Sequence, residues 1–245
     1  TGEYQPSGAS WGTRIGSFKL QVDTYDIKPL SLIAPVASAL LGNGEQVIVK
    51  FTNGGLVNVP GFSVSLYFEG NLVTTENVPN VIQPGGYLDY TFASTVDMPV
   101  IGKNYKFRIV THWLPDQFTR NDTLDVVVQK LTSNDVAAVS RYNLPGVVCG
   151  SETDFGVIIR NASGLPMQSA NVHWRINAQP VNIYNWTGNL APGDRDTVDL
   201  HATGILNGQN VLRIFTSLPN GVPDERTSND SLPPSKFTGN LDGTF

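Results

Sequence analysis

The sequence predicts an all-β protein built from two tandem β-sandwiches of about seven strands each. The first observation is a repeat: Arg120-Asn121-Asp122-Thr123-Leu124 returns as Ser228-Asn229-Asp230-Ser231-Leu232, 108 positions later. The second is composition, because 24 Gly and 16 Pro punctuate runs rich in Val, Ile, Thr, Tyr and Phe, which favour strands. The third is that no stretch has a convincing helical period.

Each copy begins with an Asp and an apolar stretch that ends in a Pro, at positions 26–35 and 135–145. Pro has no amide proton for a strand ladder, so these stretches suit edge strands. The next strand alternates apolar and polar residues, which places one of its faces in a core. It ends at an Asn turn, 53–55 in one copy and 161–164 in the other, because Asn and Gly tolerate positive φ.

The third strands carry a large apolar residue at matching positions, Leu66 and Trp174, where sandwich domains place a central core residue. A Pro-Gly pair follows in both copies, at 84–85 and 192–193, and predicts a turn with positive φ at Gly. The repeated Asn-Asp motif then leads into the closing strand of the first copy. In the second copy Pro233-Pro234 follows the motif, and the remainder reads as a tail.

We therefore expect sandwiches of the immunoglobulin or fibronectin-III type at residues 25–130 and 131–236. Residues 1–24 fit neither copy and read as a linker or as the closing strand of a preceding domain, and 237–245 read as a tail. The chain begins without Met or a signal segment, as a processed piece of a longer protein would. The stretch between the copies is too short to let them tumble freely.

Composition excludes several classes of function. A net charge of −5 without a basic stripe argues against nucleic-acid binding. No apolar run approaches the roughly 20 residues that span a bilayer. Cys149 is the single cysteine, so it forms no internal disulfide, and we expect a small buried apolar residue. A cysteine-poor, mildly acidic chain rich in Asn, Thr and Gly favours a secreted or cell-surface bacterial protein.

The repeated unit resembles the bacterial cell-adhesion-related (CARDB) domain, an immunoglobulin-like module found in tandem. The resemblance covers residues 26 to about 236. It rests on the Asn-Gly turn, the Pro-Gly pair before the fifth strand, and the Asp…Asn-Asp loop before the last strand. The sequence resembles secreted and surface proteins of the Bacteroidetes, in which such modules lie between or behind catalytic domains.

The Asp…Asn-Asp loops are candidate calcium sites, because a hard divalent ion needs several converging oxygens. The candidate ligands are Asp116, Asn121 and Asp122 in the first copy and Asp224, Asn229 and Asp230 in the second. The alternative is structural: Asn and Asp side chains fold back on their own backbone and close a turn. The different lengths of the two loops favour this structural interpretation. Otherwise no cofactor is expected.

Three segments read Asp, then Ser or Thr, then an apolar residue, and so resemble the O-glycosylation signal of Bacteroidetes secreted proteins. This resemblance implies that the hydroxyls of Thr123, Thr197 and Ser231 are acceptors. The Asn-X-Ser/Thr sequons at Asn161 and Asn185 matter only in a eukaryotic secretory pathway.

Exposed aromatic rings can stack on sugars, and Trp186, Tyr184 and Trp113 are the candidate ligand-binding residues, with Trp11 a weaker one. Tyr184 and Trp186 are two residues apart on an edge strand, so both rings project from one face. The alternative is that these rings fill the core or cap the sandwich ends, as Trp174 is expected to do.

No catalytic residue is expected. The three histidines, His112, His173 and His201, belong to no recognisable cassette, and the acidic residues are scattered in turns. The sequence therefore predicts a non-catalytic extracellular spacer and interaction module that positions the neighbouring domains of a larger chain. The alternatives are a carbohydrate-binding accessory module and a calcium-rigidified adhesin fragment. Partners would be domains of the parent chain, a cell-surface glycan or another protein.

Overall fold

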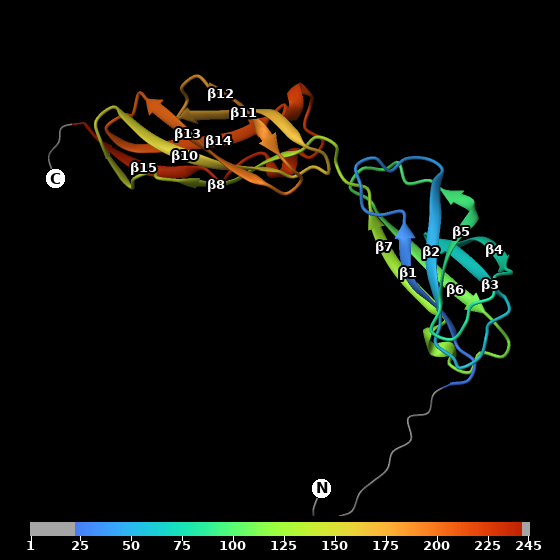
Figure 1. Cartoon of the computed structure of the whole chain (residues 1–245). Coiled ribbons are helices and arrows are strands. Elements are labelled where there is room, and N and C mark those ends of the chain that lie inside the picture. Colours follow the sequence, from blue (N-terminus) through green and yellow to red (C-terminus); the bar gives the residue numbers. More distant parts are fainter. Residues whose placement is uncertain (1–22, 242–245) are drawn as a thin grey trace, which may run out of the picture.

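In a computed structural model, which describes residues 23–241, two β-sandwiches follow one another along the chain (Figure 1). The first contains seven strands. These are β1 (Ile27–Ala34), β2 (Glu45–Asn53), β3 (Phe62–Phe68), β4 (Asn71–Val78), β5 (Tyr87–Val96), β6 (Asn104–His112) and β7 (Thr123–Gln129). They form a three-stranded sheet, β1-β2-β5, and a four-stranded sheet, β4-β3-β6-β7. This confirms the expected fold class. The prediction for residues 1–24 lies almost wholly outside the described residues.

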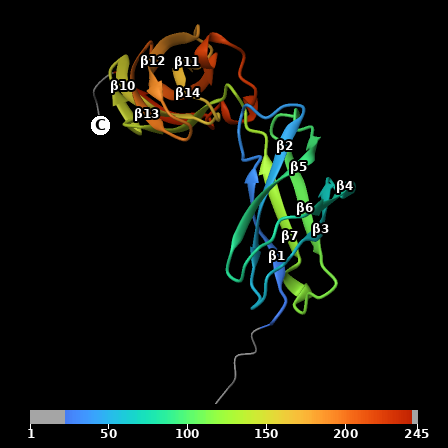
Figure 2. The same cartoon turned by 45° about the vertical axis from the view of Figure 1, so that its right-hand side comes forward.

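The second sandwich repeats this plan with one strand more (Figure 2). Its strands are β8 (Val136–Tyr142), β9 (Val147–Cys149), β10 (Glu152–Asn161), β11 (Met167–Ile176), β12 (Asn182–Leu190), β13 (Arg195–Thr203), β14 (Gly208–Ser217) and β15 (Ser235–Asn240). They form the sheets β13-β10-β8 and β12-β11-β14-β15-β9. All neighbouring strands are antiparallel except β15 and β9.

Each sandwich has its own hydrophobic core, built from the alternating residues of its two sheets. Leu66 on β3 pairs with Ile109 on β6, and Trp174 on β11 pairs with Ile214 on β14. All four side chains are buried. The expectation that Leu66 and Trp174 occupy equivalent central core positions is thus confirmed.

The Asn turns form for a different reason from the predicted one. Neither Asn53 nor Asn161 has a positive φ, whereas Gly85 and Gly193 of the Pro-Gly turns do, at 70° and 88°. Both asparagines are fully buried strand ends. The Asn53 amide donates to the carbonyl oxygens of Val57 (2.7 Å) and Ile82 (2.8 Å). Hydrogen bonding, not backbone freedom, therefore selects Asn at these positions.

The predicted tail from residue 237 is wrong for the described part of it. Strand β15 extends to Asn240 and pairs with both β14 and β9, and Phe237 is a core residue with 4% exposure. Pro233 and Pro234 interrupt the closing strand without ending it, because the chain returns to the ladder at Ser235. Cys149 also differs from expectation: it is exposed at the end of β9.

Candidate functional site: the aspartate loops

The two Asp…Asn-Asp loops occupy the same place in the two sandwiches. A single 3-10 turn, Thr119–Asn121 (η1) or Thr227–Asn229 (η3), precedes the closing strand. The extra length of the second loop lies before Asp224, around the 3-10 turn η2 (Pro219–Gly221). The spacing from the first Asp to the Asn-Asp pair is the same in both copies, so the different loop lengths do not argue against a common site.

The first Asp of each loop fastens the loop to the opening strand. Asp116 accepts a hydrogen bond from the amide of Ile27 (2.7 Å) through one oxygen and from the amide of Phe118 (2.8 Å) through the other. Asp224 likewise accepts from the amides of Val136 (2.8 Å) and Arg226 (2.7 Å). Both carboxylates have backbone donors on both oxygens, as a structural role requires.

The Asn of each loop fastens it to the Asp that opens the sandwich. Asn121 donates from Nδ2 to Asp26 Oδ1 (3.0 Å), and Asn229 donates in the same way to Asp135 Oδ1 (2.8 Å). This bond fixes the orientation of each carboxamide, so the Oδ1 atom of Asn121 points away from Asp26 and that of Asn229 points away from Asp135. Asp26 and Asp135 are both buried.

The last Asp of each loop has no such partner. Its backbone carbonyl accepts from the amide of Thr111 or Thr216, both at 2.9 Å. Its side-chain Oδ1, however, is buried without a hydrogen-bond donor, and so is Oδ1 of the preceding Asn. Asp230 is 8% exposed. The same two oxygens, on Asn121 and Asp122 and on Asn229 and Asp230, are thus left without donors in both copies.

Electrostatics distinguish these carboxyl groups from the others. Burial, reinforced by the charges of Asp116 and Asp26, raises the pKa of Asp122 to about 6. Burial and the charges of Asp224 and Asp135 raise the pKa of Asp230 to about 6 in the same way.

The calcium expectation is not decided by this geometry. Among residues 23–241, no three Asp, Glu, His or Cys side chains are gathered as a metal-binding group. The six candidate ligands lie in the two loops as expected, but four of them, Asp116, Asn121, Asp224 and Asn229, also anchor the loop. A bound cation stays a prediction.

The three candidate glycosylation acceptors are exposed. Thr123 begins β7, Thr197 lies on β13, and Ser231 forms an isolated bridge with Phe215 just before β15. Modification of these residues stays a prediction.

The three aromatic candidates for ligand binding differ in burial. Trp186 pairs with Ala170 and Tyr184 with Val172, which are core positions, so the shared face of β12 is the inner one. Trp186 is 4% exposed and donates from Nε1 to Asp196 Oδ2 (2.8 Å), so the prediction that its ring binds a sugar is wrong.

The other two rings keep some exposure. Tyr184 is the third residue of β12 and is 44% exposed. Trp113 is partly buried against the first core and contacts the edge of Tyr25 at 5.7 Å between ring centroids. Sugar binding by these two residues stays a prediction, and Trp11 lies outside the described residues.

The histidines do not converge. His112 lies on β6 of the first sandwich, and His173 and His201 lie on different sheets of the second. His112 Nε2 bonds Ser65 Oγ (2.8 Å), and His173 Nε2 bonds Ser217 Oγ (2.7 Å). The register aligns these pairs, with Ser and His exchanged between the two strands. Within the described chain, neither pair has a hydrogen-bonded carboxylate that would complete a catalytic triad.

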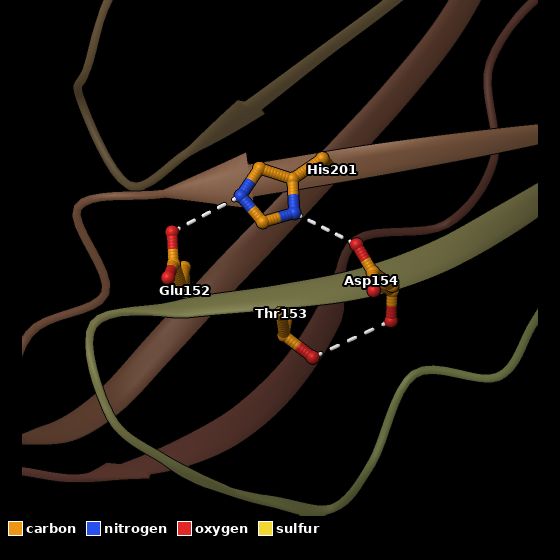
Figure 3. Close-up of polar contacts among 4 residues, drawn as sticks. All are labelled: Glu152, Thr153, Asp154 and His201. Atoms are coloured by element: carbon orange, nitrogen blue, oxygen red, sulfur yellow. Dashed lines mark hydrogen bonds and ion pairs between the residues drawn. The ribbon is translucent and has the colours of Figure 1, made fainter.

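A polar cluster around His201 was not found by sequence reasoning (Figure 3). His201 on β13 lies opposite Asp154 on β10, and its ring contacts Asp154 Oδ1 through Nδ1 (2.7 Å) and Glu152 Oε2 through Nε2 (3.1 Å). The hydrogen bond to Asp154, with that to Glu152, raises the pKa of His201. All three side chains are exposed. Only the strand register brings these residues together, and no sequence motif predicts the cluster.

Comparison with known proteins concerns the fold. The sequence matches no family model and no curated protein. The CARDB domain of a Pyrococcus furiosus protein, solved in complex with di-metal ions, is 20% identical over 45% of this chain and 93% of its own, with a TM-score of 0.33. The calcium-binding domain CBD12 of CALX1.1 is 10% identical over 80% of this chain and 81% of its own, with a TM-score of 0.42.

A third similar structure is a transglutaminase from red sea bream, 9% identical with a TM-score of 0.35. The match covers 91% of this chain and 32% of the transglutaminase, so the chain spans about a third of that protein. Within the described residues, no helix is long and apolar enough to cross a membrane.

Proposed function

We propose that this chain is a non-catalytic extracellular spacer and interaction module of a larger secreted or cell-surface bacterial protein. Its two sandwiches hold neighbouring domains of the parent chain at a set distance, and their loops are free to contact a glycan or protein. The observation that carries this proposal is the way in which the segment between β7 and β8 is bound.

The first half of this segment belongs to the first sandwich. The Lys130 amide donates to the carbonyl of Lys103 (3.1 Å), and the Leu131 amide donates to that of Ser38 (3.0 Å). The Lys130 ammonium group donates to the carbonyl of Ala39 at 2.8 Å and also to that of Leu41. Residues 130 and 131 are therefore held by the first sandwich on both their backbone and a side chain.

The second half of the segment, residues 132–134, is bound by the second sandwich and directly follows the residues that the first sandwich binds. The carbonyl of Thr132 accepts from the amide of Gly164 (2.8 Å), and the Ser133 amide donates to Glu225 Oε2 (2.7 Å). The carbonyl of Asn134 accepts from the amide of Glu225 (3.0 Å). Each residue from 130 to 134 is hydrogen-bonded to one sandwich or the other, so the segment has no residue that can act as a free hinge.

Gly164 adds a steric reason for a fixed connection. A Cβ at this position would lie 3.0 Å from Leu131 Cβ and 3.1 Å from Ala39 Cβ. These distances are shorter than ordinary van der Waals contact, so a side chain at this position would require Leu131 or Ala39 to shift by a few tenths of an ångström.

Distance measurements between spin labels test the spacer proposal. Cys149 is exposed and supplies one label, and Leu72→Cys on the exposed part of β4 supplies the other. We expect one narrow distance distribution for the parent chain. Insertion of a short Gly-Ser segment between Leu131 and Thr132 should broaden it, and Lys130→Met should broaden it less.

The matched control is Lys106→Met, because Lys106 is an exposed lysine on β6. It should leave the distribution unchanged. A parent distribution as broad as that of the inserted variant would refute the proposal, since a spacer that bends freely sets no distance.

The source and location have a separate test. If the chain is a secreted Bacteroidetes protein, hydroxyls at Thr123, Thr197 and Ser231 carry glycans. Intact-mass measurement of natively produced protein should then show hexose-sized increments that disappear in the triple Ala variant. A mass equal to that of the bare chain would remove this part of the proposal.

A further inference from the structure

The aspartate loops contain an electrostatic problem that the protein alone does not solve. In each loop, a buried carboxylate oxygen and a buried carboxamide oxygen lack any donor. A buried acceptor without a donor costs about 1–3 kcal/mol, and more when it is charged. Native proteins retain few such groups, and their presence points to a missing proton, water or ion. Here the arrangement occurs twice, in two sandwiches whose sequences have otherwise diverged.

The surroundings of the oxygens are acidic. Asp122 is close enough to Asp116 and Asp26 for their charges to disfavour its own, and Asp230 stands in the same relation to Asp224 and Asp135. In the second loop, the charge of Arg226 attracts Asp135. The corresponding position in the first loop is Phe118, but the first loop has its own basic residue, Arg120, directly before Asn121.

The donors of the anchoring carboxylates leave the free oxygens in a definite place. Asp116 and Asp224 are held by two backbone amides each, and the Asn amides are held by Asp26 and Asp135. Because Nδ2 of each Asn is used in this way, its Oδ1 is fixed on the side away from that bond. The free oxygens are therefore positioned before any ligand arrives, which lowers the entropic cost of binding.

We propose that each aspartate loop binds one Ca²⁺ ion, through Asn121 Oδ1 and Asp122 Oδ1 in the first sandwich and Asn229 Oδ1 and Asp230 Oδ1 in the second. Carboxylate and carboxamide oxygens are the ligands that calcium prefers, and no sulfur or imidazole nitrogen belongs to the set. The described Asp, Glu, His and Cys side chains do not form a three-membered ligand group. Water and backbone oxygens must therefore complete the six to eight ligands that Ca²⁺ takes.

A site with so few protein ligands binds weakly. Extracellular calcium modules bind with dissociation constants of about 10⁻⁴–10⁻³ M, and the small ligand set places these loops in that range. This inference is independent of the spacer function, since the ion could bind whether or not the chain sets a distance.

Isothermal titration calorimetry with CaCl₂ tests the inference on the full chain at pH 7.5 after EGTA treatment. We expect two sites for the parent chain, one for Asp122→Asn, one for Asp230→Asn, and none for the double variant. Asp125→Asn is the matched control, because Asp125 is exposed and paired with Arg108 at 2.8 Å. It should bind as the parent does.

Thermal unfolding supplies a second measurement that does not depend on heat of binding. Calcium at 10 mM should raise the melting temperature of the parent and of Asp125→Asn, relative to EGTA and by more than Mg²⁺ does. The double variant should melt at one temperature in calcium and in EGTA. It should also melt above the parent in EGTA, because a neutral carboxamide removes the buried charge without changing the shape of the side chain.

Two outcomes overturn the inference. The first is that 10 mM calcium neither releases nor absorbs heat and leaves the melting temperature of the parent chain unchanged. The second is that the double variant binds calcium as the parent does, which would place the ion elsewhere. Circular dichroism spectra of the variants that match the parent spectrum exclude misfolding as the cause of lost binding.

Discussion

Asn161 offers the sharpest test of how each sandwich is held together. Its Nδ2 donates to the carbonyls of Leu165 and Leu190, both at 2.8 Å, and its Oδ1 accepts from the amide of Ser163 at 3.0 Å. The side chain is fully buried. Replacement by Ala removes all these bonds and leaves their backbone partners without the carboxamide.

The expected magnitude follows from counting the groups that lose their partner. Leu165 O keeps a second donor, Ser163 Oγ at 2.9 Å, so the Leu190 carbonyl and the Ser163 amide are the groups most affected. At about 1–3 kcal/mol for each buried group left without its partner, Asn161→Ala should lower the free energy of unfolding of the second sandwich by about 3 kcal/mol. With a urea slope of about 1.5 kcal/mol per M, the midpoint should fall by about 2 M.

Urea unfolding followed by tryptophan fluorescence measures this change, because Trp174 and Trp186 both lie in the second core. Asn189→Ala is the control, since Asn189 is exposed on β12, and it should change the midpoint little. Asn53→Ala should produce the same loss in the first sandwich. Asn161→Gly decides the mechanism: if it unfolds at the parent midpoint, backbone freedom and not hydrogen bonding selects Asn, and this reasoning is wrong.

Three further predictions concern the second sandwich. Trp186→Ala should destabilise it by about 3–5 kcal/mol in the same urea assay, because a buried indole leaves a cavity; a change below 1 kcal/mol would mean that the ring lies outside the core. Asp154→Asn should lower the pKa of His201 measured by NMR titration, since the carboxylate favours the imidazolium. In the parent chain the raised pKa of His201 contributes stability at acidic pH, and this stability is lost as pH rises through that pKa. An unchanged pKa in the variant would contradict the contact. Deletion of residues 235–245 should abolish cooperative unfolding of the second sandwich, because β15 pairs with two strands, whereas a true tail would be removed without effect.

Much of the fold could be predicted because it depends on local patterns. The period of two in each strand fixes which residues share a face. The repeat shows that Leu66 and Trp174 occupy equivalent core positions in the two copies. The Pro-Gly turns follow from the φ angles that these two residues prefer, and Gly85 and Gly193 have the positive φ expected.

The candidate site was only partly predictable, because its chemistry depends on which atoms have partners. The sequence places Asp, Asn and Asp in each loop but cannot say that Asp116 uses both oxygens on backbone amides while the buried Oδ1 of Asp122 has no donor. The cluster of Glu152, Asp154 and His201 was missed for a related reason, since it forms only when β10 and β13 pair in one register.

What the sequence by itself determined is the duplicated all-β architecture, because alternation and turn chemistry are properties of short segments. The tertiary structure alone decided that Trp186 on β12 is a core residue and that Cys149 on β9 is exposed. It also decided that the chain resumes its sheet after Pro233-Pro234, since that depends on Phe237 filling a core whose other walls are far away in sequence. The physical reason is that burial and hydrogen-bond satisfaction arise from the stacking of two sheets, and no single segment contains both.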